Sequence, residues 1–380
     1  MEEWKLTKIG SLCKRVCSGG TPKSTVEEYY GGGIPWLNTK EVNFNRIYST
    51  ESTISVAGLN NSSAKWIDKH SVIVAMYGAT AAKCAIGMIP MTTNQACCNL
   101  MIDEALADYR FVYYALTNAY STLASLANGG AQQNLNAQLI KDFEIPLPDL
   151  QTQHRIADIL STIDDKIENN TRINHNLEEQ AQALYKSWFV DFEPFKDGKF
   201  VYSELGLIPE GWRIGKISDI ATVTSGKRPN VKYESSSAEH SIPVFGASSV
   251  MAFTDSVYLK ERAIITGRVG TLGILQRVDF PCWPSDNTLI IQSPYENFVY
   301  QELGEVDYSS LNRGSTQPLL TQSDLKSWSI IIPPKEIIAE YESLIRDNTD
   351  LIAEHCVQNQ RLSLLRDTLL PQLMSGQLTC

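Results

Sequence analysis

The chain has 380 residues, which allows two or three domains of ordinary size. Hydrophobic residues make up 43% of it and charged residues 20%, a composition that suits a folded globular protein and excludes a disordered or fibrous one. The longest apolar run, residues 71–82, is too short to cross a bilayer, and the N-terminus has neither the basic segment nor the apolar core of a secretory signal. We therefore expect a cytoplasmic protein without a membrane segment.

The eight cysteines and the net charge of -10 narrow the class of protein further. Cys97 and Cys98 are adjacent and no C-x-x-C pair occurs, which favours reduced thiols over a disulfide framework or a structural zinc site. The net charge is spread over four segments: 0 in residues 1–147, -4 in 148–200, -3 in 201–334 and -3 in 335–380. No segment is a basic block, so a DNA-binding role would require the basic residues to gather on one face.

The sequence repeats itself internally. Four segments of a first copy return in the same order in a second: residues 4–9 at 212–217, 34–35 at 242–243, 76–78 more loosely at 265–267, and 140–148 at 325–333. The offset falls from 208 to 185 between the first and the last match, so the first copy is the longer one. A shared order of this kind indicates an internal duplication.

Each copy begins with a stretch punctuated by Gly and Pro that contains short β-rich runs, at residues 71–76 and 263–266. This pattern predicts a mixed α/β globule. A strand that ends at Pro148 or Pro333 follows, and after it comes a long stretch without Gly or Pro. These two stretches, residues 149–193 and 335–370, are long enough for extended helices.

Both stretches have the periodicity of a coiled coil. Positions spaced alternately four and three residues apart, from Ile156 to Trp188, form the expected seam of the first stretch, and eight of these ten positions are apolar. The same ten positions shifted by 185 residues form the seam of the second stretch, and six of them are apolar. The polar positions of the two seams correspond, and we expect them to form a layer that sets the register: Asn170, Asn174, His355 and Asn359.

We therefore predict a mixed α+β fold in which two tandem globules are separated by two long helices, packed as an antiparallel coiled coil, with a pseudo-twofold internal repeat. The predicted boundaries are 1–147 for the first globule, 148–200 for the central helical region, 201–334 for the second globule and 335–380 for the distal helical region.

A search for catalytic motifs finds none. There is no P-loop, dinucleotide fingerprint, G-x-S-x-G, H-E-x-x-H or Asn-Pro-Pro-aromatic motif. Asp191 and Glu193 form an acidic pair, but their spacing to Lys196 does not fit a metal-dependent nuclease, and the flanking aromatic residues favour a docking plug or a helix end. We expect no catalytic residue and no metal site in this chain.

The loops of both globules carry small polar, basic and aromatic residues. Asn and Gln can pair with adenine, Arg and Lys with guanine, and Ser, Thr or backbone amides can hold phosphates. An ordinary solvated loop is the alternative for any single residue, but the repetition of the set favours DNA binding. The candidate DNA-binding residues are Lys23, Asn38, Lys40, Lys65, Tyr77, Thr80, Asn94, Gln132, Lys227, Arg228, Lys232, Arg268, Asn287, Arg313 and Gln317.

Over essentially its whole length the chain resembles the specificity subunit of type I restriction-modification systems. The segments that carry the resemblance are SWFVDFEPF at 187–195, GLIPEGW at 206–212, WPSDNT at 283–288 and LLPQLMSG at 369–376. The resemblance implies that 1–147 and 201–334 are target-recognition domains, each of which recognises one half of a bipartite, asymmetric DNA target. It implies that the two helical regions, 148–200 and 335–380, are conserved spacers that set the distance between the two halves of the DNA target.

The resemblance also implies the partners. They are double-stranded DNA, two methyltransferase subunits per chain, and restriction subunits in the full complex. S-adenosylmethionine, ATP and Mg are then expected on the partner subunits, with no cofactor in this non-catalytic chain. Candidate contacts to the methyltransferase are the aromatic residues Trp188, Phe189, Phe192 and Phe195, for which completion of the core is the alternative.

Two other functions are compatible with parts of the sequence. One is a stand-alone site-specific endonuclease or methyltransferase, against which the missing motifs count. The other is a purely structural coiled-coil scaffold, which has no need of two loop-rich globules.

Overall fold

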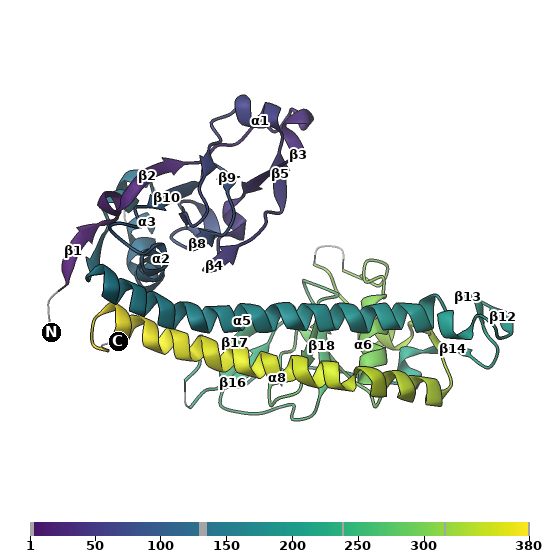
Figure 1. Cartoon of the computed structure of the whole chain (residues 1–380). Coiled ribbons are helices and arrows are strands. Elements are labelled where there is room, and N and C mark those ends of the chain that lie inside the picture. The colour runs from purple at the N-terminus through teal and green to yellow at the C-terminus, as the bar shows by residue number, and fades with distance from the viewer. Residues whose placement is uncertain (1–3, 129–134, 238, 315–316, 379–380) are drawn as a thin grey trace. The chain divides into compact units, whose positions relative to one another are not determined.

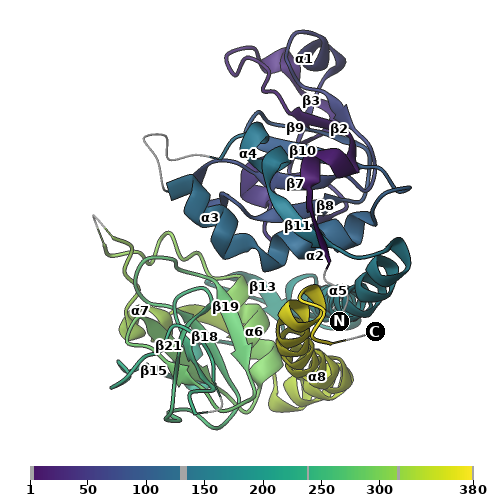
Figure 2. The ribbon, with the colours of Figure 1, turned by 90° about the vertical axis from the view of Figure 1, so that its left-hand side faces the viewer.

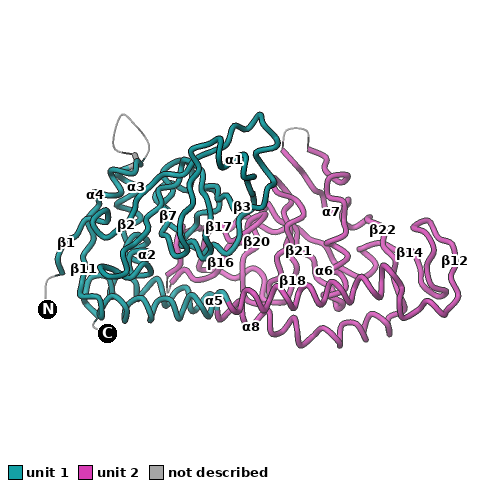
Figure 3. Tube along the Cα trace, turned by 45° about the horizontal axis from the view of Figure 1, so that its top comes forward, with its two compact units in different colours: residues 1–168, 359–380 teal, residues 169–358 magenta. Residues whose placement is uncertain are grey.

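The computed structural model describes residues 4–128, 135–237, 239–314 and 317–378, and the chain is drawn in Figure 1. It forms two compact units (Figure 3): unit 1 comprises residues 1–168 and 359–380, and unit 2 comprises residues 169–358. Each unit contains an α/β globule and a part of both long helices. The four domain boundaries drawn from the sequence remain predictions.

Two sheets form the globule of unit 1. One has the strand order β2-β10-β7-β8-β4 and the other the order β5-β3-β9-β6, and β1 pairs with β11. The strands are β1 Lys5–Lys8, β2 Cys13–Ser18, β3 Tyr30–Leu37, β4 Asn45–Ile47, β5 Ser52–Ile54, β6 Trp66–Ile67, β7 Val72–Ala75, β8 Cys84–Gly87, β9 Met91–Thr93, β10 Cys97–Ile102 and β11 Glu144–Leu147. The helices are α1 Val56–Asn60, α2 Tyr109–Asn118, α3 Tyr120–Asn128 and α4 Ala137–Asp142.

The sheet of unit 1 with the order β2-β10-β7-β8-β4 is covered on both faces at β7, which explains why β7 is a continuous apolar run. Val72 and Val74 pack on the helical side, in a core that includes Phe111 of α2. Ile73 and Ala75 point to the opposite side and pack in a second core with residues of the other sheet. Successive side chains of a strand point to opposite faces, so one short segment serves both cores.

Unit 2 repeats this topology. Its sheets have the orders β15-β21-β18-β19 and β17-β16-β20, and β14 pairs with β22 as β1 pairs with β11. The strands are β12 Phe200–Ser203, β13 Gly206–Pro209, β14 Arg213–Lys216, β15 Thr222–Ser225, β16 Ile242–Phe245, β17 Val250–Thr254, β18 Ala263–Gly267, β19 Leu275–Val278, β20 Trp283–Pro284, β21 Thr288–Gln292 and β22 Ser329–Ile332. Its shorter helices are α6 Glu296–Gly304 and α7 Gln322–Lys326, and α6 lies between the sheet and α8 (Figure 2).

The backbone pairing corrects one detail of the predicted repeat. Met76 donates its N–H to Ala96 and accepts from the N–H of Leu135, and Arg268 bonds in the same way to Asn287 and Leu320. Met76 therefore corresponds to Arg268. The looser match of residues 76–78 to 265–267 was wrong. It paired Met76 with Ile265, whereas the backbone hydrogen bonds pair Met76 with Arg268, three residues later in the second copy.

The two long helices are α5, Leu150–Tyr185, and α8, Lys335–Met374, which confirms the periodicity argument. In unit 1 the first half of α5 packs on the last part of α8, where Leu370 and Leu373 join Ile156 and Leu160 in one core. In unit 2 the second half of α5 packs on the first part of α8, and Tyr341 donates its hydroxyl hydrogen bond to the carbonyl of an α5 residue. The pairing is therefore antiparallel, as predicted.

Three residues of the predicted polar layer, Asn170, Asn174 and His355, form hydrogen bonds between the two helices in unit 2, whereas Asn359 belongs to unit 1 and its place in the layer stays a prediction. The Nδ2 atom of Asn170 donates to Gln358 at 2.7 Å, and Asn174 pairs with His355. In unit 1, the polar seam residue Arg366 forms an ion pair of 3.0 Å with Asp164. These bonds pair polar groups whose burial in the seam without a partner would lower the stability of the folded chain.

Each globule is also fixed to a helix by arginine. In unit 1, Arg46 pairs with Asp165 of α5, and in unit 2, Arg262 pairs with Asp350 of α8 at 2.7 Å. Asp165 and Asp350 differ by 185 in number, which is the offset of the repeat in this region. No helix among the described residues is long and apolar enough to span a membrane.

Candidate nucleic-acid interface

In unit 1, five loops meet at one edge of the globule. The N–H of Gly20 donates to the carbonyl of Thr93 at 2.8 Å, and the indole N–H of Trp36 donates to the carbonyl of Gly20 at 2.9 Å. The hydroxyl of Thr80 donates to the carbonyl of Thr39 at 3.0 Å. The N–H of Asn94 donates to the carbonyl of Leu37 at 2.9 Å, and the backbone of Ser63 and Ala64 lies against Gly20. We call these five loops the unit 1 loop edge: 19–23, 38–40, 63–65, 77–80 and 93–95.

Unit 2 shares part of this arrangement. The N–H of Lys227 donates to the carbonyl of Pro284 at 3.0 Å, and that of Arg268 donates to the carbonyl of Asn287 at 2.8 Å. We call the following residues the unit 2 loop edge: 226–229, 268–270, 283–287, 312–314 and 317–321. The first three ranges correspond to loops of the unit 1 loop edge, whereas 312–314 and 317–321 do not.

Close backbone approach requires a glycine at the same place in both edges. A Cβ atom on Gly19 would lie 2.1 Å from the carbonyl oxygen of Thr93, and one on Gly226 would lie 2.2 Å from that of Ser285. Any larger residue would push the two loops apart. The repeated glycine therefore fixes how the loops of each edge meet.

The unit 1 loop edge includes seven candidate DNA-binding residues, and one of them, Lys65, follows Ala64, whose backbone lies against Gly20. Lys23, Lys65 and Tyr77 are exposed, and no hydrogen bond or ion pair engages their side chains within the described part of the chain. The seven residues are Lys23, Asn38, Lys40, Lys65, Tyr77, Thr80 and Asn94. Gln132 lies outside the described residues.

Four of these side chains have partners inside the protein, among them Thr80, whose bond to Thr39 is described above. Asn38 caps the turn Thr39–Glu41 by accepting from the N–H of Lys40 at 3.3 Å. Asn94 is buried and accepts from the N–H of Ala96 at 3.1 Å. Lys40 forms an exposed ion pair with Glu51. For these residues a contact with DNA would compete with an existing bond.

The unit 2 loop edge brings together Lys227, Arg228, Arg268, Asn287, Arg313 and Gln317. The ammonium of Lys227 lies 5.4 Å from the ring centre of Tyr258, and the Nε atom of Arg228 lies 3.9 Å from Asp286. Both side chains are exposed, so these contacts are weak and exchangeable. Lys232 is exposed between β15 and β16, outside the loop edge.

Arg313 has a structural role that the sequence did not indicate. Its Nε atom lies 2.9 Å from both carboxylate oxygens of Asp324, a residue that is 5% exposed. Hydrogen bonding to this guanidinium lowers the pKa of Asp324. The pair closes the segment that leads into α7, so Arg313 stabilises the edge whether or not it also touches DNA.

The four candidate partner-binding aromatic residues pack together in unit 2. Phe189 is 5% exposed and contacts Phe298 with a ring separation of 4.9 Å, while Phe192 and Phe195 pack on Trp212. Trp188 lies against Tyr341. This packing agrees with completion of the core, and their contact with a partner stays a prediction.

Exposed apolar residues lie on the neighbouring β12–β13 hairpin, which the candidate list missed. Tyr202 is 89% exposed, and Val201, Leu205 and Leu207 are exposed as well. The signal in the sequence is two short apolar runs, 200–202 and 207–208, on either side of a turn that contains Gly206, a pattern that predicts a hairpin.

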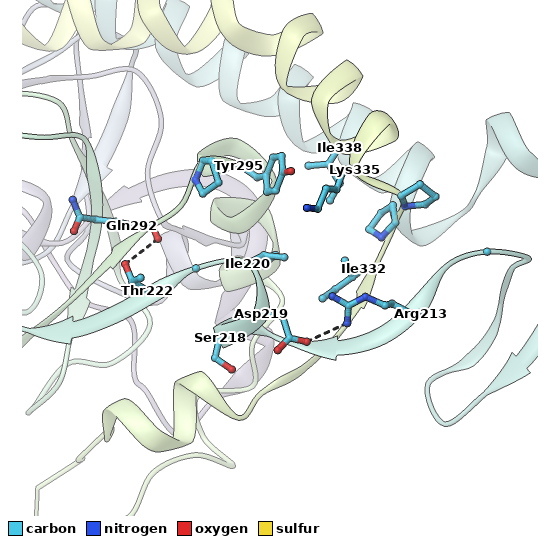
Figure 4. A pocket seen from close by; sticks show the side chains of 15 residues that line it. Arg213, Ser218, Asp219, Ile220, Thr222, Gln292, Tyr295, Ile332, Lys335 and Ile338 are labelled. Carbon is cyan, nitrogen blue, oxygen red and sulfur yellow. Dashed lines mark hydrogen bonds and ion pairs between the residues drawn. The ribbon is translucent and has the colours of Figure 1, made fainter.

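A separate cavity of about 550 Å³ lies at the start of α8 (Figure 4). Arg213 and Asp219 face each other in it at 3.2 Å, and Lys335 projects from the helix. Hydrogen bonds from the backbone of Lys216 and from Arg213 lower the pKa of Asp219. The candidate DNA-binding residues lie elsewhere, so this cavity is distinct from the loop edge.

The comparisons with known proteins agree with the repeated architecture. A family model described as the type I restriction modification DNA specificity domain matches residues 1–179 and 209–354. The MjaIX specificity subunit of Methanocaldococcus jannaschii is 31% identical over 410 residues, which cover 99% of this chain and 94% of that protein. The HindI specificity subunit of Haemophilus influenzae is 24% identical over 347 residues, covering 69% and 75%.

A solved structure shares the fold. The crystal structure of the type I restriction-modification S subunit from M. genitalium matches with a TM-score of 0.58 and 18% identity, over 97% of this chain and 96% of that one. Taken with the family model and the full-length relative, these matches show that the chain belongs to the type I restriction-modification DNA specificity family.

Proposed function

We propose that the loop edge of each unit contacts one half of a bipartite DNA target, and that the chain acts as the recognition subunit of a type I restriction-modification complex. The observation that carries this proposal is that loops at the ends of corresponding strands meet in both units, and that the loop edge of each unit bears exposed basic residues. A chain of net charge -10 needs such a local concentration of basic groups to approach phosphates.

The long helices then set the gap between the two half-sites. α5 has 36 residues and α8 has 40, and each contributes to both units. A helix of this length spans about 54–60 Å at ~1.5 Å per residue, a scale of one to two turns of DNA. The expected target has two short defined sequences with a fixed undefined gap.

The catalytic steps belong to partner subunits in this proposal. Two methyltransferase subunits bind each chain, restriction subunits complete the complex, and S-adenosylmethionine, ATP and Mg bind to those partners in the cytoplasm. The exposed apolar face of the β12–β13 hairpin supports a protein contact, because uncovered apolar surface favours association.

Co-expression of the chain with its cognate methyltransferase subunit, followed by sequencing of adenine methylation in the host DNA, tests the proposal. A bipartite motif with a fixed gap is the expected result. A continuous motif would contradict the division between two units. The isolated chain supplied with S-adenosylmethionine, or with Mg and DNA, should neither methylate nor cleave, and activity there would contradict the non-catalytic role.

A further inference from the structure

A polar hollow of about 390 Å³ lies at the unit 2 loop edge, beside the end of β18. The residues that line it are Ser225, Arg268, Thr321, Gln322, Ser323 and Lys326. They come from β15, from the end of β18 and from the start of α7, segments that are far apart in the sequence. The fold therefore builds this hollow from three separate elements.

Most polar groups of the hollow already bond to one another. The amide nitrogen of Gln322 donates to the hydroxyl of Ser225 at 2.8 Å, and the ammonium of Lys326 donates to the amide oxygen of Gln322 at 3.2 Å. The hydroxyls of Thr321 and Ser323 lie 2.8 Å apart. This network holds the amide of Gln322 in a fixed orientation, with one amide hydrogen left for a ligand.

Arg268 differs from these neighbours. Its backbone is held on both sides, because its N–H donates to Asn287 and its carbonyl accepts from Leu320, each at 2.8 Å. Its guanidinium has no hydrogen bond or ion pair to any residue that the structure describes, although the side chain is half-buried. A fixed backbone and an unengaged guanidinium leave a donor fork that lines a polar hollow and is available to a ligand.

The first copy shows that the fold does not require this arginine. The corresponding residue in unit 1 is Met76, which makes the same two backbone bonds, is 2% exposed and packs in the core. An apolar side chain therefore satisfies the packing at this position of the repeat. Of these two corresponding positions, 268 carries a charge and 76 does not, as expected for a residue that distinguishes the ligand of unit 2 from that of unit 1.

We propose that Arg268 recognises a guanine, through the O6 and N7 atoms of its major-groove edge, in the half-site bound by unit 2. This inference rests on the proposed function. A half-buried guanidinium beside an oriented amide is suited to a base edge, with which arginine forms two parallel hydrogen bonds. The exposed Lys227 and Arg228 lie on the same edge and are placed to contact phosphates.

The substitution Arg268→Met tests the proposal, because it installs the residue that the repeat already tolerates. The complex with the methyltransferase is compared with wild type by sequencing methylated sites and by binding to oligonucleotides that carry each base pair at each defined position. We expect one G·C position in one half-site to lose its discrimination by roughly 5- to 150-fold, with the other half-site unchanged. Arg213→Met, in the same unit but outside the loop edge, should leave the motif intact.

Three outcomes separate the possibilities. An unchanged motif, or a uniform loss of binding to all sequences, would overturn the assignment and would indicate a phosphate contact or none. A wild-type complex without a bipartite motif would instead contradict the proposed function itself. If the methionine variant fails to assemble, Arg268→Lys takes its place, since it keeps the charge but loses the fork, and the same position should relax.

Discussion

The Nδ1 atom of His355 on α8 lies 2.8 Å from the Oδ1 atom of Asn174 on α5. An amide oxygen only accepts, so the imidazole donates from Nδ1. His355 is 9% exposed, and Asn174 also reaches the carbonyl of Ile352 at 3.5 Å. A hydrogen bond inside an otherwise apolar seam is satisfied in one register alone, and it therefore fixes the alignment of the two helices in unit 2.

Removal of one member of this pair should cost more than removal of both. Asn174→Leu leaves the imidazole N–H buried without its acceptor, and we expect the free energy of unfolding to fall by about 1–3 kcal/mol. The double variant Asn174→Leu with His355→Leu should recover most of that loss, because no polar group stays unpaired. Urea unfolding of the four members of the cycle measures the coupling. If the losses in unfolding free energy of the two single variants simply add up in the double variant, the two side chains do not interact directly.

Glu302 should make stability depend on pH. Burial raises the pKa of this carboxyl to about 7, although Tyr185 donates a hydrogen bond of 2.8 Å to it, which acts in the opposite direction. Because the pKa in the folded chain exceeds that of the unfolded chain, the contribution to stability is largest at low pH and is lost as the pH rises from about 4.5 through 7.

The variant Glu302→Gln removes this titration and keeps an acceptor for Tyr185. We expect it to be more stable than wild type by about 2–3 kcal/mol at pH 8, with little difference at pH 4.5. Urea midpoints at the two pH values provide the measurement. Glu340→Gln, an exposed carboxyl on α8, is the matched control and should show no such difference.

The last turns of α8 should be needed for unit 1. Leu373 is fully buried in the unit 1 core, and its truncation to alanine should lower the free energy of unfolding by about 2–5 kcal/mol. Hydrogen exchange should become faster in unit 1 strands such as β10. Leu365→Ala, at an exposed position of the same helix, is the control. Equal exchange in the two variants would contradict the role of Leu373.

The paired glycines should each affect one half of the DNA target. Alanine at Gly19 or at Gly226 forces two loops apart, and we expect each substitution to weaken discrimination in a different half-site of the methylated motif. Gly304→Ala serves as the control, because no atom lies within 4 Å of the added methyl group. A simultaneous change in both halves would indicate a general loss of folding.

The β12–β13 hairpin should contribute to the methyltransferase contact. Serine at Tyr202 and Leu207 removes exposed apolar surface without touching the core, so the isolated chain should keep its melting temperature. Association with the methyltransferase, measured by sedimentation, should weaken. Val231→Ser changes an exposed apolar residue outside the hairpin and should leave association intact. Unchanged binding by the double variant would exclude the hairpin from the interface.

The features that depend on local periodicity could be predicted from the sequence. The helical seams, the polar layer at Asn174 and His355, and the duplication all follow from spacing along the chain. The α/β globules follow from short apolar runs between glycines and prolines, although the strand order does not, because pairing joins segments as far apart as Lys5 and Leu147.

The candidate site could be predicted only by residue type. The sequence does not reveal that Arg313 is held by Asp324 or that Asn94 turns inward, because both depend on contacts that tertiary folding creates. The same limit applies to Gln322 and Ser225, which escaped the candidate list although they line the hollow beside Arg268. The distinction between Arg268 and Met76 required the backbone pairing of both units.

The return of α8 to unit 1 has a consequence for biosynthesis. The ribosome makes the sheets of unit 1 first, but the core that they share with Leu370, Leu373 and Met374 is complete only when residue 374 has emerged. Unit 2, whose members end at residue 358, has all of its residues earlier. The domain that is translated first is thus finished last, and a chain that terminates before residue 370 lacks the part of its N-terminal core that α8 supplies.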